Sequence, residues 1–189
     1  MLWGANENIA ARPLYLDLER VERRVGAAKT KWMFYTRNLL IFPNLQLLEN
    51  ASLQIRVNRP ISADKTEITT YCIAPKGESR EARVRRIRQY EEFFNPSGLA
   101  TPDDTTLFED CHAAQKSDWV DWQQGYMRGL AAVRPGANAD AEELGLKPVT
   151  SLSSTAGICD ETIFHGPLRE WRRRLARATV ASALAGAAE

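Results

Sequence analysis

The sequence predicts a fold in which an antiparallel β-sheet is combined with amphipathic helices, and two patterns support this prediction. Residues 52–74 hold the strand-like runs SLQIRVNRPI and TEITTYCIA around a polar turn at 63–65, which is typical of an antiparallel hairpin. Residues 14–25 and 80–94 place apolar side chains at helical spacing, which indicates amphipathic helices. A length of 189 residues allows roughly two thirds of the unfolded surface to be buried, so we expect one globular domain and no second one.

The first half of the chain is expected to contain a helix followed by strands. The first helix carries an apolar stripe and ends at Gly26; the stripe consists of Leu14, Leu18, Val21 and Val25. The segment 33–49 is rich in aromatic and branched residues and is expected to extend the hairpin into a meander. In the first hairpin strand, Leu53, Ile55 and Val57 alternate with Gln54, Arg56 and Asn58. This alternation predicts that the apolar set forms the buried face.

The second half is expected to be mainly helical. Ser79 is predicted to cap a helix whose packed stripe contains Val84, Ile87, Tyr90 and Phe94. Thr101 is predicted to cap the next helix, which has Pro102 in its first turn and reaches about Lys116. Residues 134–150, rich in Gly and Pro, are expected to form a surface connection, and a last helix begins near Asp160.

Composition excludes several function classes. The chain has 25 Lys and Arg against 24 Asp and Glu, so it shows no overall charge bias toward nucleic acid or a membrane surface. The arginine-rich runs at 83–88 and 169–177 lie on predicted helices next to glutamates and are interpreted as solvated faces. The sequence contains no glycine-rich phosphate loop, G-x-S-x-G elbow or H-E-x-x-H motif. We therefore expect neither a nucleic-acid partner nor a membrane partner.

The cysteines and the N-terminus indicate a reducing compartment. Cys72, Cys111 and Cys159 are widely separated and form no C-x-x-C pair, which argues against a disulfide framework and a self-contained zinc site. Residues 1–30 lack a basic region followed by an apolar stretch, so no signal peptide is predicted. A cytoplasmic location is the simplest expectation.

Two adjacent acids, Asp103 and Asp104, have two interpretations. As residue types they suit the start of a helix, where acids interact with the positive end of the dipole. The functional alternative is a carboxylate at the mouth of a hydrophobic pocket. His112 lies about 12 Å further along a straight helix axis, too far to share one metal site with Asp104, and is interpreted as a surface or packing residue.

Three longer runs resemble a known family. They are RNLLIFPN, then QIRVNRPIS-x-DKTEITTYCIAPKGES, and then RIRQYEEFFNPSGLATPDD with Glu109 following. These runs resemble the C-terminal catalytic part of the alpha (large) subunit of Rieske-type aromatic-ring-hydroxylating dioxygenases, in the benzoate, toluate and anthranilate branch. The resemblance covers most of residues 1–130 and is weaker through Asp160, Glu161 and Trp171.

The resemblance implies a fold and an iron ligand. The fold is α+β of the helix-grip (Bet v 1-like or START-like) type, in which a curved antiparallel sheet wraps helices around a ligand cavity. Family enzymes hold a mononuclear non-haem Fe(II) by two histidines and one aspartate, and the matching aspartate is Asp104. Asp103 and Glu109 become candidates for orienting Asp104 or ending a hydrogen-bond chain.

The resemblance also implies a substrate cavity. Apolar and aromatic side chains suit a flat arene, and the matching wall positions are Leu48, Phe93, Phe94 and Ala100. A benzoate-like substrate needs a partner for its carboxylate. Arg37, Arg56 or Asn44 could supply it, provided that their strand face turns inward.

Parts of the family pattern are missing from this sequence. The two iron histidines belong upstream of residue 1, and the C-x-H and C-x-x-H ligands of the Rieske [2Fe-2S] cluster are absent as well. The resemblance thus implies that residues 1–189 are a truncated C-terminal part of a catalytic domain. Alone, this chain is expected neither to bind Fe(II) tightly nor to turn over, because one carboxylate is a poor transition-metal site.

The parent activity implied is NAD(P)H-dependent cis-dihydroxylation of a benzoate-like aromatic acid with O2, in aromatic compound catabolism. Electrons would come from a reductase through the Rieske cluster, and the implied assembly is α3β3 with a beta subunit, or α3. The alternative from another class is a non-catalytic helix-grip module that binds a small hydrophobic ligand, with Asp104 as a helix cap only. A basic nucleic-acid adaptor is the least favoured interpretation.

Overall fold

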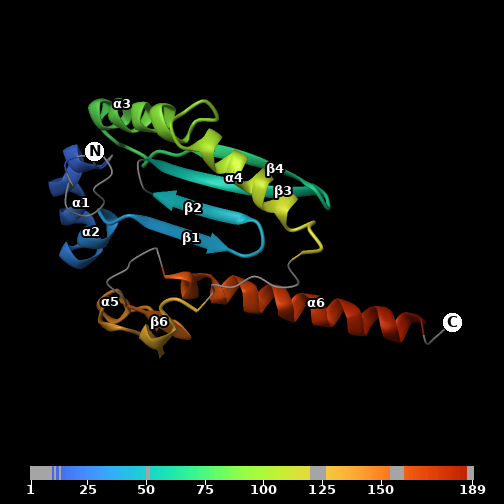
Figure 1. Ribbon diagram of the computed structural model, residues 1–189. Coiled ribbons are helices and arrows are strands. Elements are labelled where there is room, and N and C mark those ends of the chain that lie inside the picture. The colour runs from blue at the N-terminus through green and yellow to red at the C-terminus, as the bar shows by residue number, and fades with distance from the viewer. Residues whose placement is uncertain are drawn as a thin grey trace. The chain divides into compact units, whose positions relative to one another are not determined.

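The chain forms two compact units, residues 1–121 and residues 122–189. The computed structural model describes residues 10, 12, 14–49, 52–119, 127–153 and 160–186, the last seven by their backbone alone. Figure 1 shows the elements of both units. Among the described residues, no helix has the length and apolar character needed to cross a membrane.

A four-stranded antiparallel sheet is the centre of the first unit (Figure 1). Its strands are β1 (Arg37–Ile41), β2 (Leu45–Glu49), β3 (Leu53–Ser62) and β4 (Lys65–Cys72), and each pairs with the next along the chain. The predicted hairpin and meander are therefore confirmed. Together with the flanking helices, the sheet gives the α+β architecture expected of a helix-grip domain.

Helices precede and follow this sheet. The N-terminal group consists of η2 (Tyr15–Asp17), α1 (Leu18–Val25) and α2 (Ala27–Met33). After β4 come α3 (Arg80–Gln89), the π-helical turn η3 (Tyr90–Phe94) and α4 (Thr101–Ala114). Figure 1 shows α3 and α4 along one face of the sheet and α1 and α2 at one of its ends.

The helix boundaries follow the predicted signals in part. Gly26 ends α1, and the Ser79 hydroxyl accepts a hydrogen bond from the Ala82 backbone N–H at 3.2 Å, as predicted. The prediction that Thr101 caps α4 is wrong, because Ala100 occupies that position. The Thr101 hydroxyl instead donates to the Phe94 carbonyl at 2.9 Å and ties the start of α4 to the π-helical turn.

The predicted packing face of β3 is wrong, and that of residues 80–94 is correct only at Tyr90 and Phe94, which are half-buried and buried. Gln54 is only 1% exposed, so a residue of the polar set, expected to face solvent, lies in the interior. On α3, Val84 and Ile87 are exposed while Arg86 is buried. Arg86 can be buried because it pairs with the buried Glu78 at 3.1 Å, which satisfies its charge.

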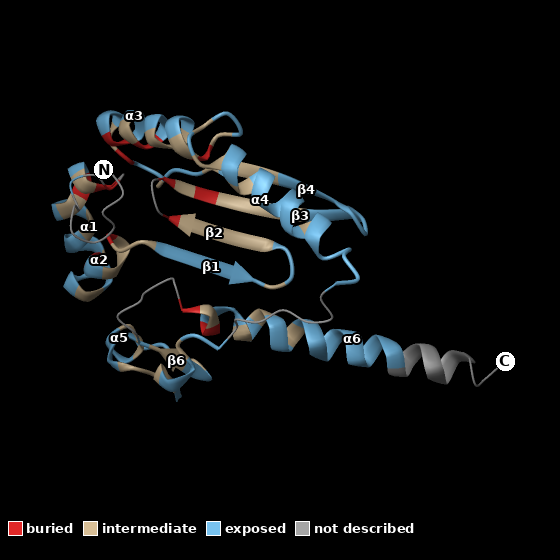
Figure 2. Cartoon of the chain, in the orientation of Figure 1, coloured by how far each residue is buried: buried red, intermediate tan, exposed pale blue. Residues whose placement is uncertain are grey.

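The interior of the first unit is largely polar. Among its described residues, the buried apolar ones are Leu14, Phe34, Ala82 and Phe94, whereas the buried polar ones are Arg12, Asp17, Thr30, Glu49, Ser52, Gln54, Glu78 and Arg86. In Figure 2 the buried residues gather where the N-terminal helices, α3 and the adjacent ends of β2 and β3 meet. Glu49 pairs there with Arg12 and Arg37. Burial lowers the pKa of Arg12 to about 10, so this guanidinium still carries its charge at neutral pH.

The second unit pairs two short strands and ends in a long helix. Its elements are η4 (Leu130–Ala132), β5 (Val133–Pro135), α5 (Ala139–Glu143), β6 (Thr150–Leu152), η6 (Glu161–Phe164) and α6 (His165–Gly186). The segment 134–150 is largely exposed, as expected of a surface connection, and contains the short helix α5. The antiparallel pair of β5 and β6 at its two ends was not predicted. The last helix begins close to the predicted position.

Helix α6 is expected to lose structure in acid through Glu170. Hydrogen bonds from Arg173 and Arg174 lower the pKa of Glu170 from 4.5 to about 2. A carboxylate whose pKa is depressed by folding stabilises the folded state above its unfolded pKa, and this stabilisation is lost as pH falls through the folded value. The circular dichroism signal of the helix should therefore fall between pH 4.5 and 2. Glu170→Gln should remove that component, and an unchanged acid profile in this variant would contradict the assignment.

Candidate functional site

The helix-covered face of the sheet carries the candidate site. The pairing register places Leu48, Gln54 and Cys72 side by side on this face, and likewise Gln46, Arg56 and Thr70. Contacts with the helices identify the covered face. Thr70 Oγ1 lies 2.8 Å from the Tyr90 hydroxyl, Arg86 Nη1 donates to Cys72 Sγ at 3.1 Å, and the Arg56 guanidinium lies 5.3 Å from the Phe94 ring centroid.

Asp104 lies on the partly covered side of α4, near Arg56. It belongs to the first turn of the helix, its N–H donates to the Ala100 carbonyl at 3.1 Å, and its side chain is half-buried. Burial lowers the pKa of Arg56, and the negative charge of Asp104 partly offsets this effect. The site thus combines a half-buried cation with a carboxylate that is close enough to act on it electrostatically.

Asp103 and Glu109 are not brought together with Asp104. Both side chains are exposed, whereas Asp104 is half-buried. A helix turns about 100° per residue, so residues one before and five after Asp104 point to other sides of α4. No hydrogen bond or ion pair found within the described residues links either acid to Asp104.

Of the predicted cavity-wall residues, Phe94 lies against Arg56, and the others are linked, directly or through a neighbour, to Phe94 or to Gln54. Phe94 is buried and Phe93 is half-buried, with their ring centroids 4.7 Å apart in an edge-to-face arrangement. Leu48 is half-buried and is the register partner of Gln54. The Ala100 N–H donates to the Phe93 carbonyl at 3.1 Å, which anchors the start of α4 beside the two aromatic rings.

The three candidate partners for a carboxylate have different surroundings. Arg37 is paired with Glu49, and the register places it on the opposite face of the sheet from Arg56. Burial and the charge of Arg12 lower the pKa of Arg37. Asn44 is exposed in the turn between β1 and β2. Of the three, Arg56 alone lies on the helix-covered face near Asp104.

The sequence-based reasoning missed several polar residues of this face. Gln54 Nε2, Arg56 Nη2 and Asn58 Oδ1 on β3, and His112 Nε2 on α4, are buried atoms that find no hydrogen-bond partner among the described residues. The alternation of Gln54, Arg56 and Asn58 was the available signal, but it was interpreted as a solvent face. His112, expected to be a surface or packing residue, is half-buried on α4.

The described residues do not supply a complete iron site. No group of three or more His, Cys, Asp or Glu side chains in the described part of the chain could hold a metal ion. Asp104 is chemically suited to be one oxygen ligand of Fe(II). Further ligands would have to come from elsewhere.

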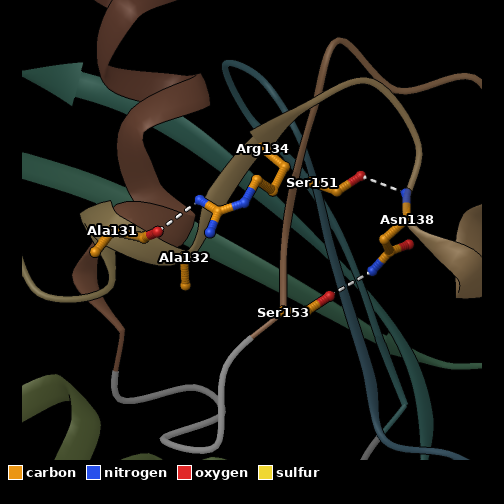
Figure 3. A pocket seen from close by; sticks show the side chains of 6 residues that line it. All are labelled: Ala131, Ala132, Arg134, Asn138, Ser151 and Ser153. Atoms are coloured by element: carbon orange, nitrogen blue, oxygen red, sulfur yellow. Dashed lines mark hydrogen bonds between the residues drawn. The ribbon is translucent and has the colours of Figure 1, made fainter.

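The second unit contains a separate pocket of about 390 Å³. It is lined by Ala131, Ala132, Arg134, Asn138, Ser151 and Ser153. Figure 3 shows Arg134 held by the Ala131 carbonyl, while Asn138 interacts with both serines. None of the site residues predicted from the sequence lines this pocket.

Comparison with known proteins connects the sequence to ring-hydroxylating oxygenases. Residues 6–147 match the family "Ring hydroxylating alpha subunit (catalytic domain)". The chain is 41% identical to the large subunit of 2-halobenzoate 1,2-dioxygenase from Burkholderia cepacia, covering 94% of this chain and 37% of that protein. It is 39% identical to the alpha subunit of toluate 1,2-dioxygenase from Pseudomonas putida, covering 93% and 37%.

A further relative is the large subunit of anthranilate 1,2-dioxygenase from Acinetobacter baylyi. It is 36% identical, and the match covers 79% of this chain and 32% of that protein. The chain therefore spans only about a third of the length of these relatives, namely 37%, 37% and 32%.

Proposed function

Because the chain belongs to the family of ring-hydroxylating dioxygenase alpha subunits, we propose that residues 1–189 form the C-terminal part of the catalytic domain of such a subunit. In the whole enzyme, Asp104 is one ligand of a mononuclear Fe(II). The two histidine ligands and the Rieske [2Fe-2S] cluster come from polypeptide outside these residues. When bound, the iron supplies the activation of dioxygen.

The position of Asp104 is the observation that carries this proposal. It is half-buried on the side of α4 that lies near Arg56, whereas the neighbouring acids Asp103 and Glu109 are exposed. A carboxylate used only to start a helix gains nothing from partial burial, since desolvation disfavours its charge. As a metal ligand, Asp104 contributes one oxygen and negative charge toward Fe(II).

The proposed substrate is an aromatic carboxylic acid. The similar proteins are named for 2-halobenzoate, toluate and anthranilate. On the helix-covered face, Leu48, Phe93 and Phe94 offer apolar and aromatic surface, and Arg56 offers a cation for the carboxylate. Burial strengthens the interaction between such a cation and a carboxylate because the local dielectric is low.

The proposed whole reaction is NAD(P)H-dependent cis-dihydroxylation of this acid in the cytoplasm. A reductase would deliver electrons through the Rieske cluster, and a beta subunit would complete an α3β3 assembly, or α3 without it. Residues 1–189 would contribute the Asp104 carboxylate that binds iron and part of the wall around the arene. They would also contribute Arg56, the partner for the carboxylate of the substrate.

Iron binding by a chimera tests the role of Asp104. The chain would replace the matching 37% of the Burkholderia cepacia large subunit, and mononuclear Fe(II) would be titrated anaerobically. Substitution of residues that only support metal ligands lowers metal affinity by about 10- to 100-fold. Asp104→Ala, which removes a ligand itself, is therefore expected to lower the affinity for Fe(II) at least as much.

Asp103→Ala is the matched control, because it removes the same group from the adjacent, exposed position. It should retain wild-type iron affinity. Equal iron binding by the Asp104→Ala and wild-type chimeras would refute the proposed function. If aromatic acids still bound to that variant, the result would support the non-catalytic helix-grip module instead.

A further inference from the structure

Gln54 and Arg56 form one hydrogen-bonded pair on the helix-covered face of β3. Arg56 Nε donates to Gln54 Oε1 at 3.2 Å. Gln54 is 1% exposed, and Arg56 is half-buried. Since the residues are two positions apart in a strand, their side chains leave the same face of the sheet. The amide oxygen of Gln54 therefore fixes the orientation of the guanidinium.

Each partner of this pair keeps a donor for which the described residues offer no acceptor. Gln54 Nε2 and Arg56 Nη2 are both buried and form no hydrogen bond with the described part of the chain. Each nitrogen is two covalent bonds away from the atom that makes the 3.2 Å contact, so the two donors lie close to the same hydrogen bond. A buried donor without an acceptor costs stability, and such a group in a native protein calls for an explanation.

An anionic acceptor would satisfy both donors. The guanidinium of Arg56 is positively charged, and Gln54 Nε2 adds a neutral N–H donor beside it. The structure contains no ion pair between Arg56 and an acid of the described residues, although Asp104 is near enough to influence its pKa. A carboxylate has two oxygens and can accept from two parallel N–H groups at once.

The surroundings fit a carboxylate that is attached to an arene. Leu48 is the register partner of Gln54 on this face, and the Phe94 ring lies 5.3 Å from the Arg56 guanidinium carbon. Phe94 stands in the π-helical turn η3. Because the donors are sealed from solvent, the incoming acid must displace the side chain that covers the guanidinium, and the Phe94 ring is the aromatic group lying against it.

We propose that Gln54 and Arg56 together anchor the carboxylate of an aromatic acid. Gln54 Nε2 donates to one carboxylate oxygen and Arg56 Nη2 to the other, while Gln54 Oε1 holds the guanidinium in place. Gln54 is thus a specificity-determining residue that selects aromatic acids over neutral arenes. The inference rests on the proposed function in that the acid is taken to be the substrate.

Calorimetric titration of the iron-free chain with benzoate and benzyl alcohol tests this anchor. The wild-type chain is expected to bind benzoate at least about tenfold more tightly than benzyl alcohol, which has the same ring but no charge. Gln54→Leu removes the second donor. Gln54→Glu keeps the shape but places a carboxylate next to Arg56. Both variants should lower the affinity for benzoate by about tenfold or more and leave the affinity for benzyl alcohol unchanged.

Gln115→Leu is the matched control. Gln115 is an exposed glutamine at the C-terminal end of α4, and its substitution removes the same amide group away from Arg56. Its substitution should leave benzoate affinity within about twofold. Circular dichroism of each variant establishes that it is folded, and Gln54→Glu provides a second variant of nearly unchanged size.

Three results would overturn the anchor. They are the absence of benzoate binding by the wild-type chain, wild-type benzoate affinity in both Gln54 variants, and an equal loss of benzoate affinity in Gln115→Leu. Failure of the anchor can be distinguished from failure of the proposed function. The anchor is tested by benzoate binding without iron, whereas the proposed function is tested by Fe(II) binding to the Asp104 chimeras. In those chimeras, Gln54 variants should keep wild-type iron affinity.

Discussion

Replacing Glu78 by alanine is expected to lower the free energy of unfolding by about 3–5 kcal/mol. The Glu78 side chain is 0% exposed and that of Arg86 is 3% exposed. Glu78 Oε2 accepts from Arg86 Nη2 at 3.1 Å, and Arg86 Nε lies 3.2 Å from both carboxylate oxygens. The alanine variant leaves the guanidinium of Arg86 buried without its counter-ion. Denaturation in urea, followed by circular dichroism, measures the loss.

An exposed ion pair provides the control for Glu78. Glu67 and Arg59 are also joined by two hydrogen bonds, but both side chains are largely exposed. Glu67→Ala should therefore have a far smaller effect, since solvent screens exposed pairs. Glu78→Gln should fall between wild type and Glu78→Ala, because an amide oxygen still accepts from Arg86. Equal losses in Glu78→Ala and Glu67→Ala would contradict the role assigned to burial.

The second large effect is expected at Gly129, where alanine should destabilise the second unit by about 2–5 kcal/mol. Gly129 has φ = +84°, and the left-handed region costs an L-residue roughly 1–2 kcal/mol. A Cβ atom would also lie 2.7 Å from Asp160 Cγ and 2.8 Å from Thr162 Oγ1, both belonging to buried residues. Overpacking of this kind typically adds about 1–3 kcal/mol.

Substitution of Gly136 distinguishes the cost of the left-handed backbone conformation from the cost of steric overlap. It has φ = +76°, but a Cβ there would meet nothing within 4 Å. Gly136→Ala should therefore show the backbone cost alone. Thermal unfolding of both variants, compared with wild type, tests the difference. If the two substitutions were equally destabilising, the close packing of Gly129 against Asp160 and Thr162 would have no energetic role.

Local sequence patterns predicted the elements of the fold better than the faces that those elements bury. The hairpin, the end of α1 at Gly26 and the cap at Ser79 depend on neighbouring residues, so they could be predicted. Alternation along β3 shows that its two faces differ, but not which one the helices cover. Gln54 can be buried because Arg56 is its hydrogen-bond partner, and this pairing becomes visible only in the folded chain.

The candidate site was accessible from the sequence through the family motif rather than through residue types. The motif selected Asp104, Phe93 and Phe94, which the structure places on neighbouring elements near Arg56. Gln54 and His112 matched no motif. Their unpartnered buried atoms depend on distances between β3, α4 and their neighbours, which no single-sequence pattern encodes.

The polar interior of the first unit has a consequence for the temperature dependence of stability. Exposure of apolar surface raises the heat capacity on unfolding, whereas exposure of polar surface lowers it. In the described part of this unit, the buried residues include more polar and charged side chains than apolar ones. Its heat-capacity increment per residue should therefore lie below the usual value of about 12–15 cal/mol/K. A smaller increment gives a flatter stability curve, so the unit should lose less stability on cooling than an apolar core of equal size.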